Sequence, residues 1–146
     1  MHYGKFDNTY VLRLDKGEEI IETLKAFCTD REITLATISG IGAVDRVTLG
    51  LFETGPKRYV AEELTGEFEL TSLTGNITTM AGEVYIHLHA AVSDIEHRTY
   101  GGHLSSGRVS ATLEIVINTL KGTVDREFSE AIGLNLMKLA KNPSFE

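Results

Sequence analysis

The chain has 146 residues and a formal net charge of −7, with 42% hydrophobic and 24% charged residues. This composition is ordinary for a globular protein, and we expect a single domain over residues 1–146. One cysteine excludes an internal disulfide framework, and the acidic balance disfavours the phosphate neutralisation that drives DNA binding. No apolar run approaches the ~20 residues of a membrane helix, so we expect a cytoplasmic protein without a membrane partner.

The first half of the sequence predicts one helix among several strands. Residues 9–14 alternate as an opening strand, and Asp15 with Glu18 has the pattern of a capping box for a helix over 18–31. Cys28 lies on the apolar stripe of that helix, so we expect its thiol to be buried. We expect further strands over residues 33–39, 44–52, 58–64 and 66–73. Glycine-containing breaks at 40–42 and 75–76 follow the first and the last of these strands.

The second half predicts a hairpin and one more strand. Residues 84–92 and 99–104 form the arms of the hairpin around a turn at 94–98, and residues 110–117 alternate as a strand. The tail over 128–139 fits both a short helical turn and a last strand. Short connections favour antiparallel neighbours. The predicted fold class is α+β: a mainly antiparallel β-sheet flanked by one main helix and a short C-terminal helical segment.

Three of the five histidines are close together in the sequence, at His87, His89 and His103. Residues two apart on a strand point to the same face, so His87 and His89 stand side by side while Leu88 faces the core. A turn centred near Glu96 would place His103 directly opposite His89, which makes His87 its diagonal neighbour. This register predicts that three imidazoles converge on one metal ion.

The predicted ion is zinc, although nickel, copper or iron also accept imidazole ligands. Three protein ligands leave a fourth position for water, a carboxylate, or a substrate or other small-molecule ligand, which is the pattern of catalytic zinc. Glu69 and Glu114 are candidate catalytic acid–base partners because each lies in an apolar strand context; exposed glutamates are the alternative. His2 and His97 are interpreted as surface residues. Arg46 and Arg108 are candidates for an anion near the site, with solvated arginines as the alternative.

Several blocks of the sequence resemble the PPC domain, the plant and prokaryote conserved domain. They are Ile38-Ser39-Gly40-Ile41-Gly42-Ala43-Val44, Glu67 to Ile77, Leu88-His89-Ala90, Gly101-Gly102-His103-Leu104 and Ala111 to Ile115. The resemblance covers residues 10–139. It implies an antiparallel sheet with flanking helices and assembly as a homotrimer.

The resemblance to plant members is incomplete at the positions connected with DNA. Plant members carry Arg-Gly-Arg segments before the domain and a Gly-Arg-Phe-Glu-Ile-Leu motif, whereas this chain has no Arg-Gly-Arg and has Glu67 at the arginine position. DNA or a DNA-associated protein is therefore a partner prediction that rests on family naming alone.

The histidine pattern also resembles acetolactate decarboxylase, a zinc enzyme that uses three histidines, and the matching positions are His87, His89 and His103. Two functions follow as hypotheses. The first is a zinc-binding homotrimeric PPC protein that acts as a regulatory or interaction module. The alternative is a zinc-dependent hydrolase or lyase acting on a small carbonyl substrate. The sequence leaves open whether the chain is an enzyme.

Overall fold

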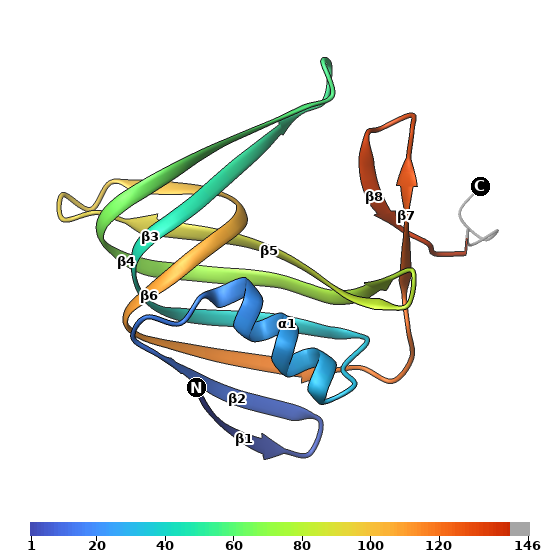
Figure 1. Cartoon of the computed structure of the whole chain (residues 1–146), viewed down its shortest axis with the longest axis horizontal. Helices are drawn as coiled ribbons and strands as arrows, with labels where there is room; N and C mark the ends of the chain where they lie inside the picture. The colour runs from blue at the N-terminus through green and yellow to red at the C-terminus, as the bar shows by residue number, and fades with distance from the viewer. Residues whose placement is uncertain (141–146) are drawn as a thin grey trace.

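The computed structural model describes residues 1–140, which form one helix and an eight-stranded sheet (Figure 1). All strand pairs are antiparallel except the short parallel pairing of β4 with β7. This confirms the α+β class. The elements in chain order are β1 (His2–Phe6), β2 (Thr9–Asp15), α1 (Ile20–Asp30), β3 (Ala36–Glu53), β4 (Arg58–Met80), β5 (Glu83–Ser93), β6 (Thr99–Thr119), β7 (Asp125–Ser129) and β8 (Leu134–Met137).

The helix begins later than the sequence pattern predicts. Glu19 is the N-cap, and its side chain accepts a hydrogen bond from the Glu22 N–H at 2.7 Å. Asp15 instead ends β2, where its N–H donates to the Glu18 carboxylate at 2.6 Å. The expected Asp15–Glu18 pair is therefore formed in the connection to the helix. Gly17, with a positive φ of 91°, turns the chain between the two elements.

The core lies between α1 and one face of the sheet. The buried stripe of the helix, which includes Leu24, Phe27 and Cys28, packs in one cluster with Leu88 and Val92 of β5. Burial raises the pKa of the Cys28 thiol to about 12, so it is the inert core thiol that the pattern predicts. Because β5 alternates, the residues between its buried positions point away from the helix.

Several strands are longer than expected because the predicted glycine breaks do not end them. β3 runs through the glycines at 40 and 42 with irregularities in register, and β4 runs through Gly75. A Cβ atom at Gly75 would collide with the backbone of His87 and Leu88 on the neighbouring strand. Glycine therefore permits a close approach of β4 and β5 at this point, where the sequence pattern suggested a turn.

The long strands join in a closed circuit of pairings. β3 pairs with both β4 and β6, and β5 also pairs with both β4 and β6. Residues 51–60, at the end of the β3–β4 pair, extend beyond this circuit as an arm, seen at the top of Figure 1. The strand that carries two of the histidines is thus held by a neighbour on each side.

The predicted C-terminal helical segment is wrong for the described part of the tail. Residues 128–139 contain the end of β7, a turn and β8, which pair as a hairpin beside the arm (Figure 1). The turn closes where the Gly133 N–H donates to the Ser129 carbonyl at 2.6 Å, with Gly133 at a positive φ of 87°. Strand pairing with β4 and within the hairpin satisfies this backbone, so the second interpretation of the tail, a last strand, is the correct one.

Across residues 1–140, no helix combines the length and the apolar character that crossing a membrane requires.

Candidate metal centre

The β5–β6 hairpin has the register that the sequence predicts. His89 lies directly opposite His103, and the pairing continues to Ser93 and Thr99. The turn between the strands is organised by Asp94, whose Oδ1 accepts hydrogen bonds from the Glu96 and Arg98 N–H groups, each at 3.0 Å. This local network fixes the length of the turn. The length of the turn then determines which residues of β5 and β6 face each other.

The three imidazoles converge on the side of the sheet opposite the helix. Ring centroids are 5.3 Å apart for His87 and His89, 5.2 Å for His87 and His103, and 5.7 Å for His89 and His103. One ligand atom from each residue lies within 4.8 Å of the other two. Tetrahedral zinc with Zn–N distances of about 2.0–2.1 Å separates its ligand nitrogens by roughly 3.4 Å. Small side-chain rotations would bring the three ring nitrogens to this spacing. The donor set therefore fits a transition-metal ion.

The surroundings keep two of these rings in the form that binds a metal. The pKa of His87 is lowered to about 4, first by burial and then by the positive charge of His103, Arg126 and His89. The pKa of His103 is also lowered, by burial and then by His89. A neutral imidazole has the free lone pair that a metal ion needs. Protons therefore compete weakly with a metal ion at His87 and His103 near neutral pH.

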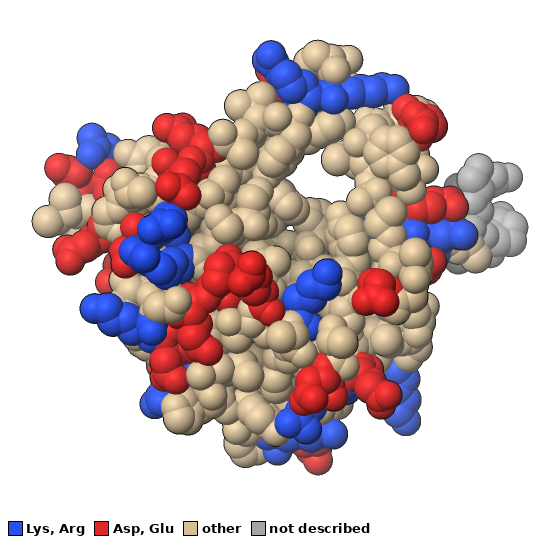
Figure 2. Space-filling view, in the orientation of Figure 1, with Lys and Arg blue, Asp and Glu red and all other residues tan. Residues whose placement is uncertain are grey.

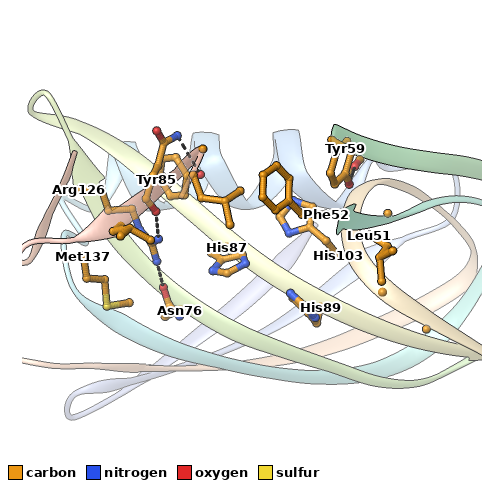
Figure 3. Close-up of a pocket in the computed structure, with 18 residues that line it drawn as sticks. Leu51, Phe52, Tyr59, Asn76, Tyr85, His87, His89, His103, Arg126 and Met137 are labelled. Atoms are coloured by element: carbon orange, nitrogen blue, oxygen red, sulfur yellow. Dashed lines mark hydrogen bonds between the residues drawn. The ribbon is translucent and has the colours of Figure 1, made fainter. Parts of the chain in front are cut away.

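The imidazoles form the floor of a cavity of about 1040 Å³. The arm contributes one wall through Leu51, Phe52 and Tyr59, and the β7–β8 hairpin contributes the other. Figure 2 shows the opening between these two walls, and Figure 3 shows the histidines lying between Arg126 on one side and Tyr59 on the other, with Phe52 beside His103. The site is therefore accessible to a small ligand.

Three close contacts shape the wall beside His103. The Tyr59 ring meets the His103 ring edge-on at 5.9 Å between centroids, and the Tyr59 hydroxyl is 2.7 Å from the Ser105 hydroxyl. A Cβ atom at Gly102 would lie 2.6 Å from the Gly50 carbonyl oxygen. Gly102 thus lets the backbone at Gly50 pass closely, and this brings the arm over the floor.

The candidate acids and arginines do not join the histidines. Glu69 and Glu114 are both exposed and do not line the cavity, so neither is placed to exchange protons with a group bound there. Arg108 pairs with Asp45 at 2.7 Å, and Arg46 is exposed outside the cavity. Alternation explains the two glutamates: each follows or precedes buried residues on its strand and points to the opposite, solvent-facing side.

A different cationic residue, Arg126 of β7, lies at the cavity and is not predicted by the sequence. It lines the cavity, is only 7% exposed, and stacks its guanidinium over the Tyr85 ring at 4.8 Å from the centroid. Its position depends on the parallel pairing of β7 with β4, which joins segments far apart in the sequence. No local pattern around Arg126 signals that pairing.

Comparison with known proteins identifies the family. The profile of the Plants and Prokaryotes Conserved (PCC) domain matches residues 1–121. The chain belongs to this family. It is the family named PPC above, so the predicted resemblance is confirmed. A metal-containing protein from Archaeoglobus fulgidus is 32% identical, with a TM-score of 0.83 over 94% of this chain and 96% of that one.

Other proteins similar to this chain carry different descriptions. A structure from Bacteroides thetaiotaomicron, provisionally described as a DNA-binding protein, is 32% identical with a TM-score of 0.92, covering 94% of this chain and 96% of that one. The bifunctional protein GlmU from Synechococcus sp. (strain JA-3-3Ab) is 30% identical over 138 residues, which are 90% of this chain and 21% of that protein. This PCC chain therefore spans about a fifth of that curated relative.

The likeness to acetolactate decarboxylase is one of fold. The enzyme from Bacillus subtilis subspecies spizizenii is 14% identical, with a TM-score of 0.55 over 80% of this chain and 54% of the enzyme. At this identity the shared architecture carries no activity over to the PCC chain.

Proposed function

We propose that this PCC protein is a metal-binding regulatory or interaction module, in which His87, His89 and His103 hold one divalent ion. The observation that carries the proposal is the convergence of three ring nitrogens within 4.8 Å, drawn from two strands of fixed register. The metal-containing relative from Archaeoglobus fulgidus supports it. A bound ion would present its remaining coordination position to the cavity, where it would take up a small-molecule ligand.

Zinc is the ion that we propose. All three ligands are imidazoles, which suit zinc, and no redox-active partner is required for a binding role. The lowered pKa values of His87 and His103 favour occupancy at neutral pH.

A binding role is better supported than a hydrolase or lyase. Zinc enzymes that activate water need an acid or base within hydrogen-bond reach of the reacting group. Among residues 1–140, no aspartate or glutamate lines the cavity, and the two candidate glutamates face elsewhere. The remaining ionisable groups around the floor are the ligands themselves, Tyr59, Tyr85 and Arg126.

Metal analysis tests the proposal directly. We expect the purified chain, loaded with zinc and then dialysed, to retain one zinc ion per chain by plasma emission spectroscopy. His89→Ala should lose more than about 100-fold in zinc affinity, because a missing ligand costs more than the ~10–100-fold loss caused by an outer-shell change. His97→Asn is the matched control, because His97 lies in the exposed turn at a φ of 63° that asparagine tolerates. Equal zinc retention by the wild type and His89→Ala would refute the site.

We also propose that the module is a homotrimer. Support comes from the family resemblance and from the exposed apolar side chains of Val11 and Ile41, at 43% and 57%, which line one surface hollow together. Contiguous exposed apolar surface is typical of sites that bind a partner. Light scattering should give three times the mass of one chain, and a monomeric mass would contradict this assembly.

The proposed module does not depend on DNA. The net charge is −7, and Figure 2 shows acidic and basic side chains interspersed on the visible face. Binding to a random duplex should be undetectable even at low salt. Tight binding that weakens steeply with added salt would instead support the provisional description of the Bacteroides relative.

A further inference from the structure

Arg126 is a buried cation held by neutral groups. Its Nε donates to the Thr78 hydroxyl at 2.8 Å, its Nη1 to the Asn135 carbonyl at 2.9 Å, and its Nη2 to the Asn76 Oδ1 at 2.9 Å. The Tyr85 ring covers one face of the guanidinium. The side chain is therefore fixed in place, although none of these four groups carries a negative charge.

The neighbouring carboxylates are engaged elsewhere. Asp125 accepts a hydrogen bond from the Thr79 hydroxyl at 3.0 Å, and Glu127 pairs with Lys138 at 3.3 Å. Within residues 1–140, no aspartate or glutamate forms an ion pair with Arg126. A buried charge is costly unless an opposite charge compensates it. The positive charge of Arg126 is thus left without a compensating anion among these residues.

The guanidinium lies beside the histidine floor. Asn76, which accepts from Arg126, is directly opposite His87 in the β4–β5 ladder. A guanidinium has five N–H donors, and the three bonds above leave one on each terminal nitrogen. Arg126 lines the same cavity as the histidines (Figure 3). Arg126 therefore has two further donors to offer a ligand in this cavity.

We propose that the cavity binds a small organic carboxylate, which bridges the ion on the histidines and the guanidinium of Arg126. The inference rests on the proposed metal site. A divalent ion on three neutral imidazoles adds two positive charges to that of Arg126, so an anion is the complementary ligand. Two donors on adjacent nitrogens match the two oxygens of a carboxylate.

The walls favour an organic body over an inorganic anion. Leu51, Phe52, Leu134 and Met137 contribute apolar surface around the polar floor. Apolar walls with a few convergent polar groups are typical of small-molecule sites, in which the polar groups set the orientation. A carboxylate with an aromatic or aliphatic body would place its charge at the floor and its body against these walls.

Benzoate is the test ligand, with neutral benzamide as its isostere and inorganic phosphate as the competing anion. Titrations by calorimetry, and by the visible spectrum of protein loaded with Co²⁺, would use wild type, Arg126→Gln and Arg126→Lys. Arg46→Gln removes an exposed arginine outside the cavity and is the matched control. Co²⁺ content is measured for each variant, and circular dichroism checks folding.

We expect wild type and Arg46→Gln to bind benzoate equally and to bind benzamide at least tenfold more weakly. Arg126→Gln should keep its Co²⁺ and lose at least tenfold in benzoate affinity, and Arg126→Lys should fall between. Unchanged benzoate affinity in Arg126→Gln, or equal affinity for benzamide, would overturn the inference while the metal site stands. Tighter binding of phosphate than benzoate would overturn the organic ligand class. A wild-type chain that retains no ion would refute the metal site and, with it, this bridging ligand.

Discussion

The floor of the cavity and its far wall are built by different kinds of contact. His87 and His89 lie on β5, which pairs with β4 along its whole length and with β6 from His89 to Ser93, and the fully buried Leu88 between them anchors the strand in the core. The β7–β8 hairpin that carries Arg126 pairs with β4 only at Thr79 and Met80. The metal ligands are therefore held by the sheet itself, whereas the anion-binding residue is carried by a lightly attached hairpin.

The largest effect should follow from disturbing the floor at Gly75. In Gly75→Ala the new Cβ meets the backbone of His87 and Leu88, so β4 and β5 must separate. We expect a loss of about 2–4 kcal/mol in the free energy of unfolding, the size of a severe overpacking effect. Zinc affinity should fall with it because His87 moves. Urea unfolding and zinc titration measure the two effects.

Gly55→Ala is the control for Gly75→Ala. A Cβ atom there has no heavy atom within 4 Å, and the residue lies in the exposed turn of the arm. Its stability should stay within about 0.5 kcal/mol of wild type, as for most surface changes. If the two alanine variants unfold alike, the close approach of β4 and β5 does not determine the stability of the floor.

A smaller effect should appear as a pH dependence of the metal-free floor. The pKa of His87 is about 4 in the folded chain and 6.5 ordinarily, so the unfolded state binds the proton more readily. The contribution of neutral His87 to the free energy of unfolding is therefore fully present above pH 6.5 and is lost as the pH falls toward 4. Melting temperatures of the metal-free chain between pH 7.5 and 4.5 measure this loss. His87→Asn should show a shallower decline, and an identical decline would exclude His87 as a source of it.

The floor could be predicted from the sequence, and the wall could not. The His-x-His spacing and the short turn at Asp94 are local features, and they sufficed to place His89 opposite His103. Arg126 requires a parallel pairing between β4 and β7, which no periodicity encodes. The apolar context of its strand makes Glu69 a candidate, but the same alternation that buries Leu70 exposes Glu69.

The strands are longer than the sequence predicts for a related reason. Glycine signals both turns and close strand contacts, and the sequence alone does not distinguish them. At Gly75 the deciding factor is the backbone of β5, which approaches closely only in the folded sheet. The tail is ambiguous because residues 128–139 show neither a clear helical periodicity nor a clear strand periodicity. Pairing between β7 and β8 decides for the strand.

The smallest effect should come from loosening the β7–β8 hairpin by removing the hydrogen bond that Lys57, in the tip of the arm, makes to it. Its Nζ donates to the Glu130 carbonyl at 2.7 Å and so joins the arm to the β7–β8 hairpin. Lys57→Met removes the donor and keeps the aliphatic stem that packs beside Gly133. Global stability should fall by less than about 1 kcal/mol, because one exposed hydrogen bond is lost. Hydrogen exchange should speed up several-fold in β7 and β8 and stay unchanged in β5 and β6. Lys16→Met controls for loss of a surface charge, and equal acceleration in β5 would mean that floor and wall open as one unit.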